Sequence, residues 1–287
     1  YEWNTVVLTR RLISHFSSGD NGPPEGIRLY IIPVVNPDGL YAVTGGRPMD
    51  GVDFSSRPIE QGRLNANGVD LNRNYPDPED GPHPDGNEWQ QETLAFMQLA
   101  EDFTFTMSAN THGGAEVLNY PWDTWPQLAA DNQWWIDVCR EYADTVHLYA
   151  PADYLNEFNN GITNGYQWYT ISGGRQDYMN YFHNCREVTM ELSDTKLLPP
   201  AQLPDHWEWN YRSLINYMEQ SLFGVNGTVT DLDTGEPLGA KVYIDGHDID
   251  NSFVYAYPGN GYYQRLLEPG TYNITYSAPG HYPVTIE

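Results

Sequence analysis

The stretch "WQQETLAFMQLAEDFTFTMSANTHGG", residues 89–114, carries the pattern that decides the fold. Its first half spaces apolar residues as an amphipathic helix does, and "FTFTMSAN" then has the composition of a β-strand. The strand delivers His112, and the two glycines after the histidine let other groups approach its ring closely. We therefore expect a helix followed by a strand, with a metal or ligand site where the strand ends.

Helical and strand patterns also alternate on both sides of this stretch. Residues 2–16 and 204–223 have the apolar spacing of amphipathic helices, and another helix is expected near 127–143. The run "IRLYIIPVV", residues 27–35, is typical of a strand buried on both faces, and "EVTMEL", residues 187–192, is a further strand. This alternation predicts an α/β fold.

The composition changes near Phe223. From there to residue 287, short runs rich in Val, Tyr, Thr and Ile alternate with Gly, Pro, Asp and Asn turns, and no helical pattern appears. We expect a larger domain over 1–222 and a small all-β sandwich over 223–287. The sandwich offers no cluster of titratable groups suited to catalysis, which favours a structural or docking role.

The chain is strongly acidic, with 39 Asp and Glu against 14 Lys and Arg and a formal net charge of -25. Such a charge repels nucleic acid and anionic membranes, and it favours cationic partners or simply a solubilising surface. No apolar run is long enough to span a bilayer. Cys139 and Cys185 can pair or stay free, and we favour a disulfide.

Three segments hold residues suited to chemistry. The loop 62–77 presents Arg63, Asn72 and Arg73, which together suit a clamp for a free carboxylate, although solvated arginines in a turn give the same pattern. Glu191 lies among apolar neighbours, which raise the proton affinity of a carboxylate and so suit a general base. The alternative is that Glu191 is a structural carboxylate paired with an arginine. Tyr169 precedes a Gly-Gly turn that can act as a hinge, or it is one of many surface tyrosines.

These segments, taken in order, resemble the zinc metallocarboxypeptidases, specifically the branch that contains carboxypeptidases N, E, M and D, whose catalytic domain is followed by a transthyretin-like sandwich. The resemblance rests on the following segments: "NPDG", "GRLNANGVDLNRN", "THGGAEVLNYPWD", "NGITNG", "GGRQDYMNY", "MELSD" and "APGHYPVT". It implies a mixed sheet flanked by helices, a Zn²⁺ cofactor, and a substrate that is the C-terminus of a peptide or protein. It also implies secretion, to an extracellular or periplasmic location.

The resemblance implies a role for each candidate residue as well. His112 would be the third zinc ligand and Glu191 the general base and acid. Arg63 would polarise the scissile carbonyl, Asn72 and Arg73 would bind the terminal carboxylate, and Tyr169 would close over it. In this branch an acidic residue eleven positions after the histidine goes with a preference for C-terminal Lys or Arg.

That acidic position is Asp123 here, and Gln176 matches a glutamine on the pocket wall. A buried aspartate would reject apolar side chains because they leave it unpaired, whereas a turn aspartate would not select at all. The segment "GGRQD" also places Arg175, where the branch has methionine, beside the expected pocket. We expect this arginine to offset part of the attraction for a basic side chain.

The family's first two zinc ligands come from a His-x-x-Glu segment, and no histidine of this chain is followed three positions later by Glu. We therefore expect the chain to be an N-terminally truncated catalytic domain that supplies one ligand, or the protein to have lost its metal site. The leading hypothesis is a zinc exopeptidase that removes C-terminal residues, with a preference for Lys or Arg. The alternatives are a non-catalytic relative that binds peptide C-termini and a metal-dependent deacylase on the same fold.

Overall fold

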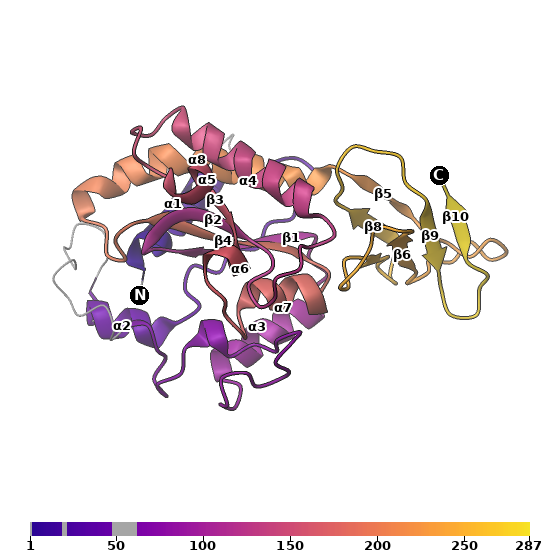
Figure 1. The fold of residues 1–287 in the computed structure, drawn as a ribbon, viewed down its shortest axis with the longest axis horizontal. Coiled ribbons are helices and arrows are strands. Elements are labelled where there is room, and N and C mark those ends of the chain that lie inside the picture. Colours follow the sequence, from indigo (N-terminus) through magenta and orange to yellow (C-terminus); the bar gives the residue numbers. More distant parts are fainter. Residues whose placement is uncertain (1, 19–21, 48–61) are drawn as a thin grey trace.

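The computed structural model describes residues 2–18, 22–47 and 62–287. An α/β body occupies most of the chain, and a smaller all-β sandwich follows it at one end (Figure 1). The predicted α/β class with a terminal sandwich is therefore confirmed.

The body is built around a mixed sheet of four strands in the order β1-β4-β2-β3. Strand β4 (Arg186–Ser193) is central and buried along its whole length, as its apolar sequence predicts. It pairs in parallel with β1 (Met107–His112) and antiparallel with β2 (Ala115–Tyr120), and β2 pairs in parallel with β3 (Ile162–Asn164).

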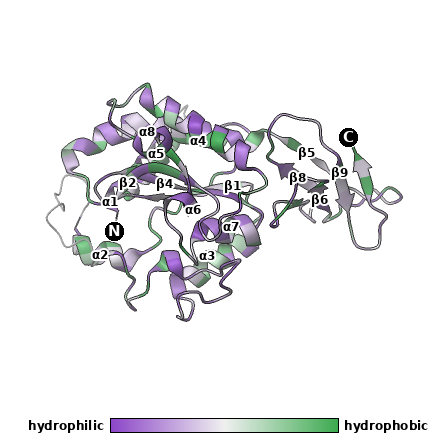
Figure 2. Cartoon of the chain, viewed as in Figure 1, coloured by the Kyte–Doolittle hydropathy of each residue, from purple (hydrophilic) through white to green (hydrophobic). Residues whose placement is uncertain are grey.

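Helices cover both faces of this sheet (Figure 1). One face carries α1 (Trp3–Ser17), α4 (Asn132–His147) and α8 (Leu203–Glu219). The other face carries α2 (Pro37–Thr44), α3 (Gln91–Asp102) and α7 (Arg175–Phe182). Short helical turns complete the body: η2 (Leu71–Arg73), α5 (Glu157–Asn160), α6 (Gly165–Trp168), η3 (Pro200–Gln202) and η4 (Gln220–Leu222). The long helices carry hydrophilic and hydrophobic residues side by side (Figure 2), which is why each buries one face.

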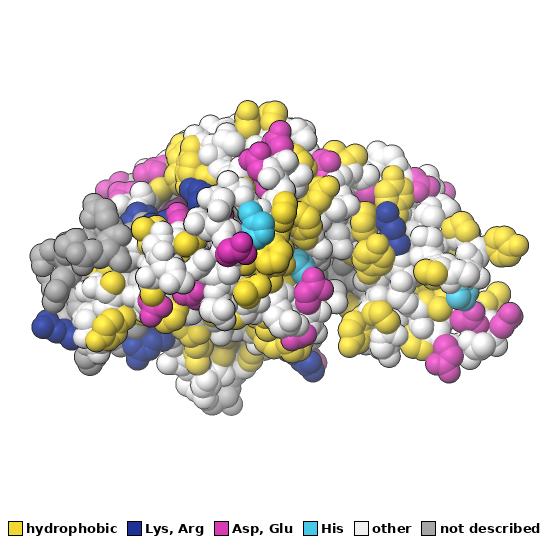
Figure 3. All heavy atoms as spheres, turned by 90° about the horizontal axis from the view of Figure 1, so that it is seen from below, with side chains coloured by type: hydrophobic (Ala, Val, Ile, Leu, Met, Phe, Trp, Pro, Cys, Tyr) yellow, Lys and Arg dark blue, Asp and Glu magenta, His cyan; other side chains and the backbone are white. Residues whose placement is uncertain are grey.

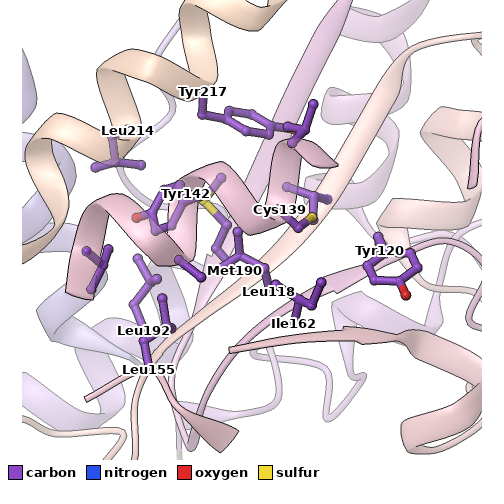
Figure 4. Packing of buried hydrophobic residues seen from close by; sticks show 14 of the residues in the cluster. Leu118, Tyr120, Cys139, Tyr142, Leu155, Ile162, Met190, Leu192, Leu214 and Tyr217 are labelled. Atoms are coloured by element: carbon purple, nitrogen blue, oxygen red, sulfur yellow. The ribbon is translucent and has the colours of Figure 1, made fainter. Parts of the chain in front are cut away.

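The main hydrophobic core lies between the sheet and the helices α4 and α8. Figure 4 shows Met190 and Leu118 from the sheet facing Tyr142 of α4, with Tyr217 of α8 nearby. All four side chains are almost fully buried. This packing fixes the strands whose ends carry the candidate site.

The sandwich consists of a sheet in the order β10-β9-β6-β7 and a two-stranded sheet of β5 and β8. Its strands are β5 (Val225–Thr228), β6 (Lys241–Ile244), β7 (Val254–Tyr255), β8 (Tyr262–Arg265), β9 (Ile274–Ser277) and β10 (Val284–Ile286). Two predictions about the sandwich remain untested: that it is transthyretin-like, and that the boundary falls at residue 222.

Buried charges join the sandwich to the body. The Arg265 guanidinium, fully buried, lies 2.9 Å from a carboxylate oxygen of Asp131, which precedes α4, and 2.6 Å from one of Asp248. Arg186 donates to the same Asp131 carboxylate at 2.6 Å. Because these charges have lost their water, each depends on its partners.

Three predictions about the fold were wrong. Residues 27–35 form no strand, and Tyr30 and Ile32 are 39% and 42% exposed. The cavity beside this segment is lined by residues of β1 and of the helices α1, α3, α7 and α8, and no described strand pairs with residues 27–35. Helix α4 begins at Asn132 rather than near residue 127, and the Asp131 carboxylate before it accepts from Arg186 and Arg265 instead of capping the helix.

The disulfide is also absent. Cys139 and Cys185 are both free and buried. They lie in different hydrophobic clusters, since Cys139 faces the main core from α4 whereas Cys185 packs near Tyr178 and lies 3.3 Å from the Ser108 hydroxyl. Burial raises the pKa of both thiols, which keeps them protonated.

Candidate active site

His112 and Glu191 lie side by side at the carboxyl edge of the sheet. They occupy opposite positions in the parallel register of β1 and β4. Because neighbouring parallel strands end at the same edge, the two side chains come from distant parts of the sequence to one place. The structure therefore brings together the residues that the sequence analysis expected to share a site.

A third group at this edge, Glu2, was missed in the sequence. Its carboxylate is buried and lies 3.6 Å from Nδ1 of His112 and 3.4 Å from the Lys196 ammonium. Burial raises the pKa of Glu2, but the hydrogen bond and charge of His112 outweigh it and leave the pKa below its ordinary value. The one signal in the sequence was an acidic residue directly before an apolar helix, and nothing in its spacing pointed to His112.

The surroundings of Glu191 differ from those of Glu2. It is 9% exposed, and its Oε2 has no hydrogen-bond partner among the described residues. Burial raises the pKa of Glu191, and the positive charges of His112 and Lys196 reduce that effect only in part. A buried carboxylate oxygen without a partner, beside an imidazole, is free to accept a proton from a bound molecule.

The loop predicted to clamp a carboxylate is organised by Asp70. One oxygen of Asp70 accepts Nε–H of Arg63 at 2.8 Å, and the other accepts the backbone N–H of Asn72 at 3.0 Å. Arg63, Asn72, His112 and Glu2 all line one cavity. Sequence reasoning did not single out Asp70, although its place between the candidate residues of the loop is a signal for a positioning role.

Arg73 lies in the same short helix η2 but does not line that cavity in the structure. Its guanidinium donates to the backbone carbonyl of Asn72 at 2.6 Å. Asn72 in turn accepts the backbone N–H of Arg175 at 3.0 Å through its side chain. Asn72 and Arg73, the two residues of the predicted clamp, are therefore adjacent. In this structure the Arg73 guanidinium and the Asn72 side-chain oxygen are both hydrogen-bonded to backbone groups of the protein.

Asp123 occupies a buried polar position below this loop. It is 2% exposed, and one of its oxygens accepts from Asn119 at 2.9 Å and from Gln176 at 3.2 Å. Burial raises the pKa of Asp123 to about 6, against the hydrogen bond from Asn119 and the charge of Arg73. The described residues supply neutral donors at this carboxylate and no cation in hydrogen-bonding contact.

Two other buried aspartates hold the Asp123 segment in place. Asp177 accepts the backbone N–H groups of Asp123 and Thr124 at 2.9 to 3.1 Å. Asp77 accepts the Thr124 hydroxyl and the backbone N–H of Gly173 at 2.9 and 3.0 Å. A Cβ at Gly165 would lie 1.7 Å from an Asp123 oxygen, so only glycine fits beside this carboxylate.

Arg175 lines the same cavity as His112 and Arg63. Its guanidinium donates to Glu187 at 2.8 Å and to the carbonyl of Ala109 at 2.9 Å, and it stacks over the ring of Phe96. The buried Glu187 carboxylate holds it against β1 and β4. The effect of Arg175 on a basic substrate therefore stays a prediction, with its guanidinium engaged by Glu187 and by the Ala109 carbonyl.

Tyr169 is 47% exposed and follows helix α6, with its ring against that of Trp168. The exposed position suits a side chain that moves.

Figure 3 shows that acidic side chains are scattered over one face of the molecule rather than gathered in a single patch. The net charge therefore does not mark the site by itself.

The donor atoms at this edge of the sheet are of the kinds that zinc binds. Catalytic zinc takes nitrogen and oxygen ligands at about 2.1 Å, and two tetrahedral ligands then lie roughly 3.4 Å apart. The 3.6 Å between His112 Nδ1 and Glu2 Oε1 fits one shared ion. Among the described residues no group of three His, Cys, Asp or Glu side chains completes such a site, so this pair supplies two ligands.

The fold is that of the carboxypeptidases. The thrombin-activatable fibrinolysis inhibitor has a TM-score of 0.61 at 16% identity, covering 78% of this chain and 60% of that one. Carboxypeptidase A from Helicoverpa armigera has a TM-score of 0.57 at 19% identity, covering 76% and 57%. A mixed sheet flanked by helices is common to them.

The chain belongs to the zinc carboxypeptidase family, whose model matches residues 24–213. It is 35% identical to carboxypeptidase D of Rattus norvegicus over 304 residues, which cover 98% of this chain and 21% of that protein. It is 36% identical to the carboxypeptidase N catalytic chain of Mus musculus, over 91% of this chain and 62% of that one. Zn²⁺ is the cofactor of the family. No helix within the described ranges is long and apolar enough to cross a membrane.

Proposed function

We propose that this protein is a zinc-dependent exopeptidase that removes the C-terminal residue of peptides or proteins, with a preference for Lys or Arg. The observation that carries the proposal is the meeting of His112, Glu2 and Glu191 at one edge of the sheet, beside the Arg63 loop. The chain spans about a fifth of carboxypeptidase D, so the activity is proposed for the whole protein.

His112 and Glu2 would hold the zinc ion, and the proposal requires one further protein ligand from outside the described residues. The bound ion supplies a Lewis acid that polarises the scissile carbonyl. Glu191 is the base: its unpartnered Oε2 takes a proton from the attacking water and gives it to the leaving amine.

Arg63 donates to the carbonyl oxygen as negative charge develops on it, and Asp70 holds its guanidinium at 2.8 Å in a fixed orientation. Arg73 and Asn72 bind the substrate's terminal carboxylate, for which Arg73 exchanges its bond to the Asn72 carbonyl for the stronger charged partner. Tyr169, exposed at the end of α6, closes over the bound residue.

Preference for Lys or Arg is assigned to Asp123. It is buried, it has neutral donors on one oxygen, and the absence of a side chain at Gly165 keeps its carboxylate from being blocked. An incoming ammonium or guanidinium would pair with a carboxylate that burial has already made costly to ionise, whereas an apolar side chain would leave it unpaired.

The test is zinc analysis and peptide hydrolysis on the protein at its full encoded length. We expect about one zinc per chain and release of C-terminal Arg or Lys well above that of Phe. The Glu191→Gln variant should keep its zinc and lose activity by 10² to 10⁴. Glu116→Gln, on β2 and bound to the backbone N–H of Leu155, serves as the matched control and should remain active.

Each alternative gives a distinct result. A protein that binds zinc and peptide C-termini but cleaves nothing would be a non-catalytic relative. A protein that hydrolyses substrates with a blocked C-terminus as well as free ones would be a deacylase, because the Arg73 clamp would then have no role. Activity retained in Glu191→Gln would contradict the assigned base.

A further inference from the structure

The buried carboxylate of Asp77 connects two parts of the candidate site, the Asn72–Arg73 clamp and the segment that carries Asp123. Asp77 follows Arg73 by four residues and is 2% exposed. Its backbone pairs with that of Gly81 through hydrogen bonds of 2.8 and 3.0 Å, which close the loop on itself. The loop therefore presents the Asp77 side chain from a firmly held backbone.

The two oxygens of Asp77 accept hydrogen bonds from three separate segments. One oxygen accepts the backbone N–H groups of Glu79 and Asp80, within its own loop, at 2.9 and 3.0 Å. The same oxygen accepts the Thr124 hydroxyl at 2.9 Å, and the other accepts the backbone N–H of Gly173 at 3.0 Å. An ionised carboxylate offers about four acceptor sites, and four donors occupy them here. The place of this carboxylate is therefore set by all three segments together.

Thr124 connects Asp77 to the predicted selectivity residue Asp123, which directly precedes it in the chain. The Asp177 carboxylate accepts the backbone N–H groups of both residues at 2.9 to 3.1 Å. The carbonyl of Asp123 also accepts the backbone N–H of Ile171 at 3.3 Å. The backbone on which Asp123 stands is thus fixed to Asp77 on one side and to the segment before α7 on the other.

Gly173 brings the turn before α7 against the clamp. Its φ is 71°, and a Cβ there would collide with the carbonyl oxygen of Arg73, so glycine alone permits this approach. The Gly173 carbonyl accepts the backbone N–H of Tyr75 at 3.1 Å, and its own N–H donates to Asp77. The loop that carries Arg73 is therefore bonded to both backbone groups of this glycine.

The residues that flank the glycine turn are bonded to the same loop. The Arg175 backbone N–H donates to the side-chain oxygen of Asn72 at 3.0 Å, and the Ser172 hydroxyl donates to the Asp80 carboxylate. The clamp, the turn and the Asp123 segment thus form one connected set of hydrogen bonds. The Asp77 carboxylate is the group in this set that is bonded to all three.

A C-terminal residue must satisfy two groups of the site at once. Its terminal carboxylate would go to the clamp and its side-chain cation to Asp123, and the number of methylenes between them sets how far apart these charges lie. When the protein groups are held at one separation, a side chain of another length leaves one of them without its partner. A rigid connection between the two groups therefore selects for length as well as for charge.

We propose that Asp77 is a positioning residue that fixes the separation between the carboxylate clamp and Asp123, and that it thereby selects Lys over shorter basic side chains. This inference rests on the proposed function, which assigns the clamp and Asp123 to the substrate. One missing methylene in a fitted pocket changes recognition by about tenfold or more. A residue that only stabilised the fold would weaken the binding of all peptides equally and would leave this ratio unchanged.

The experiment measures, by calorimetry, the binding of two acetylated tripeptides, Gly-Gly-Lys and Gly-Gly-ornithine, whose last side chains differ by one methylene. The protein is the zinc-loaded full-length chain with Glu191→Gln, so that the peptides are bound and not consumed. We expect the Lys peptide to bind at least about tenfold more tightly. Adding Asp77→Asn should reduce the ratio to below about threefold. Thr124→Val, which keeps the shape of the side chain and the backbone bonds of Asp77, should do the same.

Ser213→Ala is the matched control, because this fully buried hydroxyl donates to the Tyr142 carbonyl at 3.0 Å, between α8 and α4. It should keep the parent ratio. A ratio that stays near tenfold in both Asp77→Asn and Thr124→Val would overturn the proposal, and so would a parent protein that binds both peptides equally or binds neither. Length-selective binding by a protein that cleaves neither peptide when Glu191 is present would contradict the proposed function and leave this inference standing.

Discussion

Replacing Asp123 by Asn is expected to stabilise the folded protein at neutral pH while removing its preference for basic C-termini. The substitution keeps the shape of the side chain and the oxygen that accepts from Asn119 and Gln176. It removes a negative charge that is buried without a cation in contact. The substitution therefore removes the free-energy cost of a buried charge in the substrate-free protein. It also removes the carboxylate that would pair with a basic substrate side chain.

The structure sets the size of both effects. The pKa of Asp123 is raised from 3.8 to about 6, chiefly by burial. Each tenfold change in proton affinity corresponds to about 1.4 kcal/mol, so the ionised carboxylate destabilises the fold by up to about 3 kcal/mol. Removing one partner of a buried charge pair weakens binding by about 2–5 kcal/mol, which is a loss of roughly 30-fold or more in preference for Arg over Phe.

The direction of the pKa shift of Asp123 determines how the stability gain depends on pH. Above about pH 6 Asp123 is ionised in both folded and unfolded states, and the full cost is present. As the pH falls towards about 4, the folded protein takes up the proton first and the cost disappears. The gain in the free energy of unfolding of Asp123→Asn should therefore be largest above pH 6 and fall below about 1 kcal/mol near pH 4.

The assays are urea unfolding at both pH values and kcat/KM for peptides that end in Arg, Lys or Phe. Asp77→Asn is the control, because this carboxylate is as deeply buried but accepts the backbone N–H groups of Gly173, Glu79 and Asp80, and its loss should destabilise the fold. An Asp123→Asn variant that is less stable at every pH, or that still prefers Arg, would refute the reasoning.

Three further outcomes are expected. In the unmodified protein, KM for peptides ending in Arg should rise as the pH falls below about 6, because Asp123 takes up a proton, while KM for Phe should stay level; equal pH profiles would contradict this. Arg265→Met should cost about 3–5 kcal/mol in unfolding free energy, because Asp131 and Asp248 lose a buried partner. Limited proteolysis of this variant should then release the sandwich. An unchanged cleavage pattern would show that the charges do not join the sandwich to the body. A reducing agent should leave Tm unchanged, since Cys139 and Cys185 are free, and a lower Tm would reveal a disulfide.

Local pattern sufficed for most elements and for several site residues. The helix and strand around residues 89–112, the central strand and the final helix follow from apolar spacing, which depends only on neighbours along the chain. His112 and Glu191 were identified because each ends a strand, and parallel strands place such residues at one edge. The change of composition near Phe223 likewise predicted an all-β part, and its first strand, β5, begins at Val225.

The contacts that the sequence did not reveal are all between distant segments. Glu2 reaches His112 only because α1 packs against the sheet edge, and Arg175 pairs with Glu187 only because that carboxylate is buried within its reach. The apolar run 27–35 has the pattern of a strand, yet a strand also needs a neighbour to bond its backbone, and β1 does not fill that place.

The sequence by itself thus determined the class of fold, the order of its elements and the chemical types at the site, because these depend on spacing along the chain. The tertiary structure decided which charges pair and which carboxylate is left without a partner. Those depend on distances and burial between residues far apart in sequence, and the free energy of a charge or a backbone group is fixed by what surrounds it in space.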